Sequence, residues 1–377
     1  MEKMNLKTGI MLIATVFIAV AAEVDTFGIE QFYPTKTGTA EWNSAHWNNG
    51  EERTVRYRDD EYDPTNWTED HSGGTDGFYI DGNGIMRMSG SGPRFHINSL
   101  DDSMVPAQFF RDIEFTAYYK RRGTTGRDWG GMVVGLRSGP LGHASAGGDN
   151  CDATTYYARF RNDGKWDFEK ELKHPGSDYW SGSGFHTQDP LWGGDPLPLD
   201  RWIGMKYLAY NVDEGERVRL ELYIDSTSNG EPVDGGNWEL VGTVTDSGNW
   251  PSGDVSGCGY DQNAIILEGN GTVLMRTDED TAYYKYVTVR EIDPLAATDI
   301  ERWNGHVAMP QHRSRSVWRV ICGNAVLQLP GLSEETSRYR IFTLRGELVK
   351  TGMSDKYVIR GLQQGMYLLE RKGLNSE

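Results

Sequence analysis

The chain has 377 residues, of which 37% are hydrophobic and 25% are charged, and this composition is typical of a globular protein with one large or two modest domains. Its 38 basic and 55 acidic residues give a formal net charge of -17, which argues against nucleic acid or an anionic membrane as a general partner. The net charge does not exclude an anionic substrate that binds in a local basic groove.

The N-terminus has the features of a secretory signal peptide. Lys3 and Lys7 precede an apolar run at residues 9–20, and Ala19-Val20-Ala21 fits the small-x-small pattern of a cleavage site. Roughly a dozen apolar residues are too few to span a bilayer as a helix. We therefore expect residues 1–22 to be removed, no membrane span to remain, and the mature protein to be secreted or held at the cell surface.

The rest of the chain is predicted to be all-β, because helical patterning is scarce and short strand-like runs alternate with glycine-rich turns. Residues 23–293 are expected to form an antiparallel two-sheet jelly-roll sandwich with an irregular N-terminal strap. Residues 294–316 are interpreted as a linker, and residues 317–377 as a small C-terminal β-sandwich. In the large unit, strands are predicted before the central hairpin at 78–80, 85–88, 95–97, 113–120 and 132–136. After the hairpin they are predicted at 203–210, 218–224, 238–245, 264–267, 272–276 and 283–292. In the small unit they are predicted at 317–321, 325–329, 339–343, 348–351, 357–360 and 366–371.

The central hairpin is predicted around Asp163-Gly164, since this pair between two alternating runs is a strong hairpin signal. If the two residues form the whole turn, Tyr157 pairs with Lys170, Arg159 with Phe168 and Arg161 with Trp166. These six side chains would then share one face of the sheet. The acidic residues of the second strand would face the other way: Asp167, Glu169 and Glu171.

A long aromatic loop follows the hairpin at residues 175–199. Loops of this length without strands or helices are usually functional or disordered, and disordered segments are poor in aromatic residues. Tyr179 and Trp180 are therefore predicted to fold over the groove and stack on sugar rings.

The C-terminal stretch 339–371, which ends in Ile-Arg-Gly-Leu-Gln-Gln-Gly-Met-Tyr-Leu-Leu-Glu, resembles the C-terminal secretion or sorting domains of the Bacteroidetes–Fibrobacteres group. The resemblance implies a partner in the secretion machinery. A small sugar-binding sandwich is the alternative interpretation of the same residues.

Residues 77–293 resemble the concanavalin-like jelly rolls of secreted polysaccharide lyases and carbohydrate-binding proteins. The resemblance rests on Gly-Leu-Arg-Ser-Gly-Pro-Leu-Gly-His at 135–143, on Lys-Glu-Leu-Lys-His-Pro at 170–175, and on the closing stretches 275–278 and 286–292. It implies an acidic polysaccharide as the partner, and a lyase or a lectin as the function.

A lyase of acidic polysaccharides must neutralise a uronate carboxylate, remove the neighbouring proton and protonate the leaving oxygen. We predict that Arg159 and Arg137 bind the carboxylate, that His143 or His174 takes the proton, and that Tyr157 returns one. Lys170, opposite Tyr157 in the predicted register, would favour the tyrosinate. Further substrate contacts are predicted from Arg161, Trp166, Tyr179, Trp180, Lys206, Arg219 and Tyr223, the last three lying on strands with one polar face.

Two other function classes remain open from the sequence. A retaining glycoside hydrolase would need two carboxylates about 5 Å apart in the groove, and Asp167, Glu169 and Glu171 supply such groups only if the groove is on their face. A binding module would use the same rings and polar groups without chemistry.

The three cysteines and the acidic loops predict one crosslink and no definite cofactor. Cys151 and Cys258 lie in Gly/Asp-rich loops of one domain and are the expected disulfide, which leaves Cys322 unpaired. The loops at 147–152 and 76–83 have the composition of structural calcium sites without the spacing of an EF-hand. No metal ligand is assigned, because no Cys/His spacing resembles a zinc site.

Overall fold

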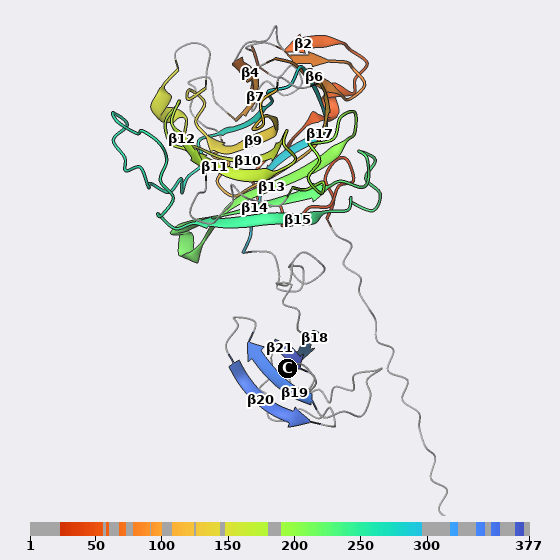
Figure 1. Ribbon diagram of the computed structural model, residues 1–377, viewed down its shortest axis with the longest axis vertical. Coiled ribbons are helices and arrows are strands. Elements are labelled where there is room, and N and C mark those ends of the chain that lie inside the picture. Colours follow the sequence, from red (N-terminus) through yellow and green to blue (C-terminus); the bar gives the residue numbers. More distant parts are fainter. Residues whose placement is uncertain are drawn as a thin grey trace, which may run out of the picture. The chain divides into compact units, whose positions relative to one another are not determined.

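The computed structural model describes residues 23–55, 58–59, 68–72, 78–90, 92–99, 108–123, 126–143, 148–179 and 190–295, together with strands of the C-terminal region. The chain divides into two compact units, Met1–Ala297 and Thr298–Glu377 (Figure 1). Regular structure in the described residues is almost entirely β-strand, which confirms the predicted all-β class. In this part of the chain, the search for a helix long and apolar enough to cross a membrane finds none.

Nine of the described strands form one antiparallel sheet of the large unit, here called the nine-stranded sheet. The strand order is β15-β14-β13-β8-β17-β6-β5-β2, and β1 pairs with β17. Figure 1 labels β15, β14, β13, β17, β6 and β2 of this sheet. Their bounds are β1 Trp42–Asn43, β2 Arg53–Val55, β5 Phe78–Ile80, β6 Met86–Met88, β8 Ile113–Arg122, β13 Ile203–Val212, β14 Arg217–Asp225, β15 Glu239–Asp246 and β17 Thr281–Glu291.

The second sheet of the large unit, here called the eight-stranded sheet, has the order β12-β11-β10-β9-β16-β7-β4-β3. Its strands are β3 Arg58–Asp59, β4 Thr68–Ser72, β7 Arg94–Asn98, β9 Gly131–Ser138, β10 Thr155–Arg161, β11 Trp166–Glu171, β12 Ser177–Tyr179 and β16 Thr272–Arg276. Among the described residues, short 3-10 helices lie between strands at η1 Ser44–Trp47, η2 Asn150–Asp152 and η4 Asp213–Gly215. The predicted strand at 264–267 is wrong, since these residues lie outside any strand.

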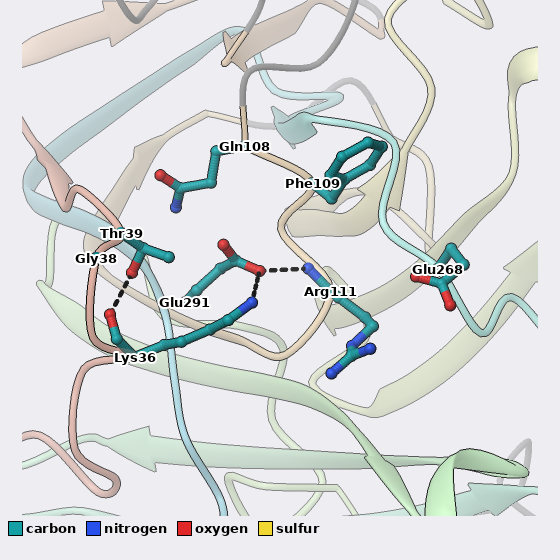
Figure 2. Close-up of a pocket in the computed structure, with 8 residues that line it drawn as sticks. All are labelled: Lys36, Gly38, Thr39, Gln108, Phe109, Arg111, Glu268 and Glu291. Carbon is teal, nitrogen blue, oxygen red and sulfur yellow. Dashed lines mark hydrogen bonds and ion pairs between the residues drawn. The ribbon is translucent and has the colours of Figure 1, made fainter.

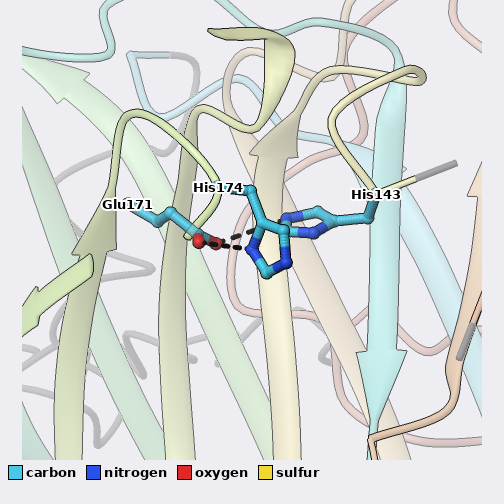
Figure 3. Close-up of side chains that lie close together, drawn as sticks. All are labelled: His143, Glu171 and His174. Carbon is cyan, nitrogen blue, oxygen red and sulfur yellow. Dashed lines mark hydrogen bonds and ion pairs between the residues drawn. The ribbon is translucent and has the colours of Figure 1, made fainter. Parts of the chain in front are cut away.

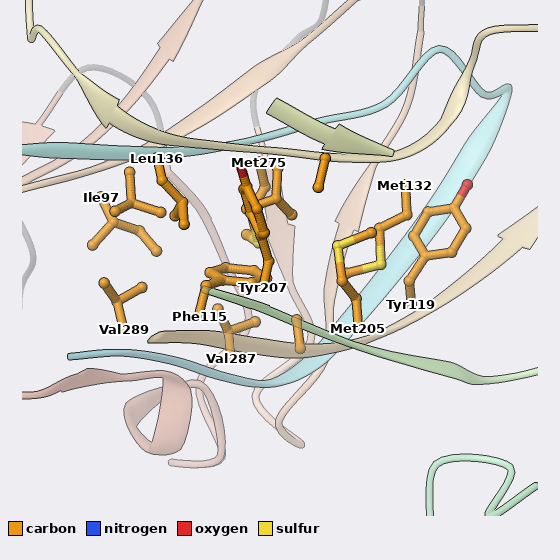
Figure 4. Close-up of a cluster of buried hydrophobic side chains, with 14 of the residues drawn as sticks. Ile97, Phe115, Tyr119, Met132, Leu136, Met205, Tyr207, Met275, Val287 and Val289 are labelled. Carbon is orange, nitrogen blue, oxygen red and sulfur yellow. The ribbon is translucent and has the colours of Figure 1, made fainter. Parts of the chain in front are cut away.

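The hydrophobic core lies between these two sheets. Side chains alternate along each strand, so every second residue turns inward and the set between them turns outward. Figure 4 shows Met132 and Leu136 of β9 and Met275 of β16 meeting Phe115 of β8 and Tyr207 of β13. All five side chains are fully buried. The outward residues of both sheets are therefore free to carry polar groups.

The central hairpin has a different register from the predicted one. Tyr157 lies opposite Glu169, and Arg159 lies opposite Asp167. The loop comprises Asn162, Asp163 and Gly164, because the Arg161 N–H donates to the Lys165 carbonyl oxygen at 2.9 Å. Gly164 has a φ of 79°, as the last residue of a three-residue hairpin loop requires.

One extra loop residue exchanges the two faces of the second strand. Tyr157, Arg159 and Arg161 do share the outer face, as predicted, but their neighbours on that face are carboxylates. The residues predicted to face outward instead turn toward the core: Trp166, Phe168 and Lys170. The prediction for β11 was therefore wrong on both faces, because side-chain parity depends on the loop length.

The C-terminal unit contains a four-stranded antiparallel sheet in the order β18-β21-β19-β20. Its strands are β18 Val317–Cys322, β19 Ser337–Thr343, β20 Leu348–Ser354 and β21 Met366–Lys372. Four of the six predicted strands of this unit correspond to these elements. The strands predicted at 325–329 and 357–360, the signal peptide at 1–22 and nearly all of the linker lie outside the described residues.

Candidate functional site

A cluster of four polar side chains lies at one end of the outer face of the eight-stranded sheet. The Tyr157 hydroxyl donates to Glu171 Oε2 at 2.8 Å and lies 3.0 Å from His143 Nε2. The His174 Nδ1 atom lies 2.8 Å from Glu171 Oε1, so one carboxylate contacts two imidazoles and a phenol. Figure 3 shows both rings directed toward the carboxylate. We call these residues the Tyr157 cluster: His143, Tyr157, Glu171 and His174.

The two histidines lie in two loops, and both loops are hydrogen-bonded to the same short helix, η2. His143 lies in the loop after β9, where Leu141 N–H donates to Asp152 Oδ2 at 2.8 Å. The His174 N–H donates to the Asn150 carbonyl oxygen at 2.9 Å. Both acceptors belong to η2, and Cys151 within η2 forms the predicted disulfide with Cys258. The crosslink therefore constrains the segment that positions both imidazoles.

The Tyr157 ring lies over a position without a side chain. Gly135 of β9 is the register partner of Tyr157, and a Cβ atom at Gly135 would lie 2.9 Å from Tyr157 Cε1. A larger residue at 135 would thus push the ring away from its neighbours. The glycine of the Gly-Leu-Arg-Ser stretch provides room for the ring.

Burial and hydrogen bonding separate the protonation states within the cluster. Burial alone would raise the pKa of Glu171, but its contacts with His143 and His174 lower it to about 2. Burial lowers the pKa of His143, against the opposing attraction of Glu171. Burial and the Glu171 charge together raise the pKa of Tyr157 well above its usual value. The predicted tyrosinate is therefore disfavoured, and Tyr157 is held as a neutral proton donor.

The arginines of β10 are already bound by carboxylates. Arg159 makes a bidentate contact with Asp167 at 2.6 and 2.8 Å, and its NH1 atom lies 2.9 Å from Glu169. Arg161 contacts both Asp163 and Asp167. The predicted role of Arg159 as the carboxylate-binding group would require it to leave these partners.

Arg94 of β7 is a further cation that interacts electrostatically with this cluster, and it was missing from the predicted set. Its Nε atom is buried and has no hydrogen-bond partner among the described residues. Burial lowers the pKa of Arg94, while the nearby Tyr157 and Glu171 oppose the shift. The alternation of Arg94, His96 and Asn98 with Phe95 and Ile97 could have indicated a strand with a polar outer face. No local pattern indicates that β7 reaches this cluster.

Two predicted site residues on the hairpin lie in the core. Lys170 Nζ is fully buried and lies 2.8 Å from Asp246 Oδ2, where it also donates to the Trp250 carbonyl oxygen. Trp166 packs inside the sandwich against Gly242 of β15. Neither side chain reaches the Tyr157 cluster, because the corrected register turns both inward.

Arg137 also turns inward, although its position in the alternation predicts the outer face. A β-bulge between β9 and β16 occurs at this point, and Arg137 has a φ of 61°. The bulge re-aims its side chain so that it donates to the Ile266 carbonyl oxygen at 2.7 Å and contacts Asp112 at 3.3 Å. Burial lowers its pKa to about 10. Arg137 is thus a buried structural cation rather than a neighbour of Tyr157.

Lys206, Arg219 and Tyr223 lie on the outer face of the other sheet. Lys206 Nζ contacts Glu114 Oε1 at 2.8 Å, whereas Arg219 and Tyr223 contact Glu221 at 2.9 and 2.8 Å. The N-terminal segment packs on this face through Phe27, Ile29, Phe32 and Tyr33. The prediction that these three residues line the same groove as Tyr157 is wrong, because the sandwich separates them. Tyr179 belongs to β12, which pairs with β11, and Trp180 lies outside the described residues.

A separate pocket of about 300 Å³ contains none of the predicted site residues. It is lined by Lys36, Gly38, Thr39, Gln108, Phe109, Arg111, Glu268 and Glu291. Figure 2 shows Glu291 between Lys36 and Arg111, and it accepts hydrogen bonds from the Lys36 ammonium and the Arg111 main chain. The Lys36 cation is thus already paired within the pocket.

The loops considered for calcium use their carboxylates in local hydrogen bonds. Asp81 accepts from the main-chain N–H groups of Asn83 and Ile85, and Asp149 accepts from Cys151. Among the described residues, the group of three or more His, Cys, Asp or Glu side chains with metal-binding geometry consists of His143, Glu171 and His174. Neither acidic loop forms such a group there.

No protein-family model matches the chain, and no curated protein matches it in sequence. Among solved structures, the alginate lyase Aly36B is 9% identical over 69% of this chain and 98% of its own, with a TM-score of 0.31. The alginate lyase vAL-1 from Chlorella virus is 10% identical over 60% of this chain and 93% of its own, also with a TM-score of 0.31. A legume lectin-like domain from Entamoeba histolytica is 12% identical over 60% and 91%, with a TM-score of 0.29. Similarities of this size do not indicate an activity.

Proposed function

We propose that the protein is an exported polysaccharide lyase that cleaves an anionic, uronate-containing glycan by β-elimination at the Tyr157 cluster. The observation that carries the proposal is the Tyr157 hydroxyl, held 3.0 Å from His143 Nε2 and 2.8 Å from Glu171 Oε2. Arg94, whose buried Nε has no hydrogen bond to a described residue, interacts electrostatically with Tyr157 and Glu171. A proton donor, a proton acceptor and a cation for a carboxylate are the three groups that this elimination needs.

Each residue has a defined part in the reaction. Arg94 binds the uronate carboxylate and stabilises the negative charge that develops when the adjacent carbon loses its proton. Neutral His143 takes that proton, because burial keeps its imidazole unprotonated. The electron pair forms the C4–C5 double bond, the C4–oxygen bond breaks, and Tyr157 gives its proton to the leaving oxygen. The products are an unsaturated uronate end and a free hydroxyl.

The contacts within the cluster also reset it. After the elimination His143 carries a proton and Tyr157 lacks one, and the two groups are within hydrogen-bond distance. Transfer from imidazolium to tyrosinate restores both without an external acid. Glu171 contacts His143, Tyr157 and His174, so it acts as a positioning residue that stabilises the imidazolium between the two steps.

Glycoside hydrolysis is less well supported, even though the register places three carboxylates on this face. A retaining hydrolase needs a carboxylic acid with a raised pKa beside a carboxylate. The pKa of Glu171 is instead lowered to about 2, and Asp167 and Glu169 are paired with Arg159. Glu171 is therefore not expected to supply the neutral carboxylic acid, and Asp167 and Glu169 are held by Arg159.

The same proposal gives the two ends of the chain a role in export. Residues 1–22 act as the cleaved signal peptide, and residues 317–377 act as the sorting domain that engages secretion machinery. The Cys151–Cys258 disulfide supports an oxidising destination, because such bonds persist outside the cytosol.

The decisive experiment compares Tyr157→Phe with wild type on a panel of acidic and neutral polysaccharides. The readout is the ultraviolet absorbance of unsaturated uronate ends. Loss of the catalytic proton should lower the rate on the responsive acidic glycan by roughly 10²–10⁴-fold. Tyr223→Phe is the matched control, since it removes a buried hydroxyl contact on the other sheet, and its rate should stay at the wild-type value.

The binding-module alternative has its own outcome. If no glycan produces unsaturated ends while one of them still retards the protein in an affinity gel, the enzyme assignment is lost. Retardation that disappears in Arg94→Ala would then identify the same face as a sugar-binding surface.

A further inference from the structure

Three side chains of the Tyr157 cluster have the composition and spacing of a transition-metal site. Glu171 ends β11, His174 follows three residues later, and His143 comes from the loop after β9. The His143 Nε2 atom lies 3.3 Å from Glu171 Oε2, and His174 Nδ1 lies 2.8 Å from Glu171 Oε1. One ligand atom from each residue lies within 4.8 Å of the others, and Figure 3 shows the three groups converging.

The 3.3 Å separation of His143 Nε2 and Glu171 Oε2 is close to that of two ligands of four-coordinate zinc, whereas the 2.8 Å contact of His174 is a direct hydrogen bond that an ion would replace. Imidazole nitrogen and carboxylate oxygen bind Zn²⁺ at about 2.0–2.2 Å, so ligand atoms around one ion lie roughly 3.4 Å apart in a tetrahedron. Two histidines and one carboxylate would fill three positions and leave one open. Calcium and magnesium prefer all-oxygen sets, so two imidazoles favour a transition metal over either.

The surroundings favour occupation by an ion. His143 and Glu171 are buried, with 5% and 4% of their surfaces exposed, and thus offer a dry pair of ligands. The His174 side chain is 36% exposed, which gives an ion a route from solvent. The Nδ1 atom of His143 is buried without a hydrogen bond to any described residue, so the ring loses no hydrogen bond there if it turns to meet an ion.

We propose that His143, Glu171 and His174 bind one divalent transition-metal ion of the zinc class, and that the bound ion switches the site off. The second half rests on the proposed lyase function. A bound ion takes the His143 lone pair that would accept the substrate proton, and it takes the carboxylate that supports the imidazolium. Metal binding and proton transfer at this cluster are therefore mutually exclusive, and free zinc becomes a regulator of activity.

The binding half is tested without any activity measurement. The full chain, produced without a histidine tag and stripped with a chelator, is titrated with Co²⁺ and followed by its visible ligand-field absorption. Zn²⁺ is titrated in parallel by calorimetry. One ion should bind, and Zn²⁺ should displace Co²⁺. His174→Gln, the variant least expected to disturb folding because its side chain is partly exposed, should lower the zinc affinity by about 100-fold or more.

His46→Gln is the matched control. His46 belongs to η1, packs against Trp42 of β1 and is not part of the site. The variant should bind Zn²⁺ like wild type. Absence of stoichiometric binding by wild type, or equal binding by His174→Gln, would overturn the metal site.

The regulatory half is then measured on the responsive glycan. Stripped protein should be active, and zinc should inhibit it at the concentrations that saturate the calorimetric site. Inactive stripped protein that zinc restores would overturn the inhibitory assignment. Zinc binding in a chain that shows no lyase activity in any form would overturn the proposed function and leave the ion site standing, so the two failures are distinguishable.

Discussion

The outer faces of the two sheets use similar residues to different ends. On the nine-stranded sheet, Glu114 lies between Lys206 and Arg290 at 2.8 and 2.7 Å, and all three are almost fully buried. The N-terminal segment covers this face, and the Phe32 N–H donates to the same carboxylate. These charged side chains on the nine-stranded sheet are therefore paired with one another, and they help to hold the N-terminal segment on the sheet.

On the eight-stranded sheet the pairing is incomplete. Arg159 is neutralised by Asp167 and Glu169, but Arg94 has a buried Nε without a hydrogen bond to any described residue. One carboxylate, Glu171, is shared by two imidazoles and a phenol. Alternating polar residues alone thus do not distinguish the face that binds the N-terminal segment from the face of the proposed site. The two faces differ in how completely their charges are paired.

The largest expected effect is on stability, from Glu114→Gln on the paired face. The substitution keeps the shape but leaves Lys206 and Arg290 buried without their counter-charge, and breaking a buried pair costs about 3–5 kcal/mol. Urea unfolding should show this loss in the free energy of unfolding, while the lyase rate per folded molecule is unchanged.

Asp200→Asn is the matched control, because it removes a charge from the exposed Arg122–Asp200 pair. It should cost less than about 1 kcal/mol. Equal effects of the two substitutions would mean that the covered face does not depend on its charge network.

The next effect is on activity, from Arg94→Ala on the incompletely paired face. Removal of a group that stabilises developing charge should lower kcat/KM by roughly 10²–10³-fold. The same variant should be at least as stable as wild type, because a poorly paired, partly buried cation is itself unfavourable. Steady-state kinetics and urea unfolding together check this prediction. Arg94→Ala should lose activity and keep its stability, whereas Glu114→Gln should lose stability and keep its activity.

Arg87→Ala tests whether the loss is specific, since Arg87 is an exposed arginine of β6 that stacks on Tyr79. It should keep wild-type kinetics. Unchanged kinetics in Arg94→Ala would assign the uronate carboxylate to another cation.

The smallest effect concerns the β16–β17 loop, which joins the two sheets. Glu279 is fully buried there, 3.7 Å from Arg121, and burial raises its pKa to about 7 despite that cation. A carboxyl group with a raised folded-state pKa holds a proton in the native state that the unfolded state has lost. Its contribution to the free energy of unfolding should therefore fall as the pH rises from about 4.5 to about 7, by up to about 3 kcal/mol.

Glu279→Gln should remove this pH dependence, so the variant should gain stability over wild type at pH 8 and little at pH 4. Asp213→Asn in η4 is the control, because Asp213 is exposed and pairs with Arg217, and this variant should follow the wild-type curve. Parallel wild-type and Glu279→Gln curves across this pH range would show that the group keeps its ordinary pKa in the native protein.

The sequence by itself determined the features that depend on local pattern. Period-two alternation predicted the all-β class, and most strands of the large unit lie where it placed them. Asp163-Gly164 predicted the central hairpin, and shared parity placed Tyr157, Arg159 and Arg161 on one face. The loop composition predicted the Cys151–Cys258 disulfide. Each inference needed only neighbouring residues or a short candidate list.

Tertiary structure decided the features that depend on counting across loops or on strand order. One additional loop residue moved Lys170 from the expected site into the core and brought Glu171 to Tyr157, because parity inverts with each residue. A bulge turned Arg137 inward against the alternation. Lys206 was predicted for the site and Arg94 was not, yet strand order placed Lys206 on the nine-stranded sheet and Arg94 on the eight-stranded sheet. Long-range pairing, which no local pattern encodes, therefore determined which polar residues meet.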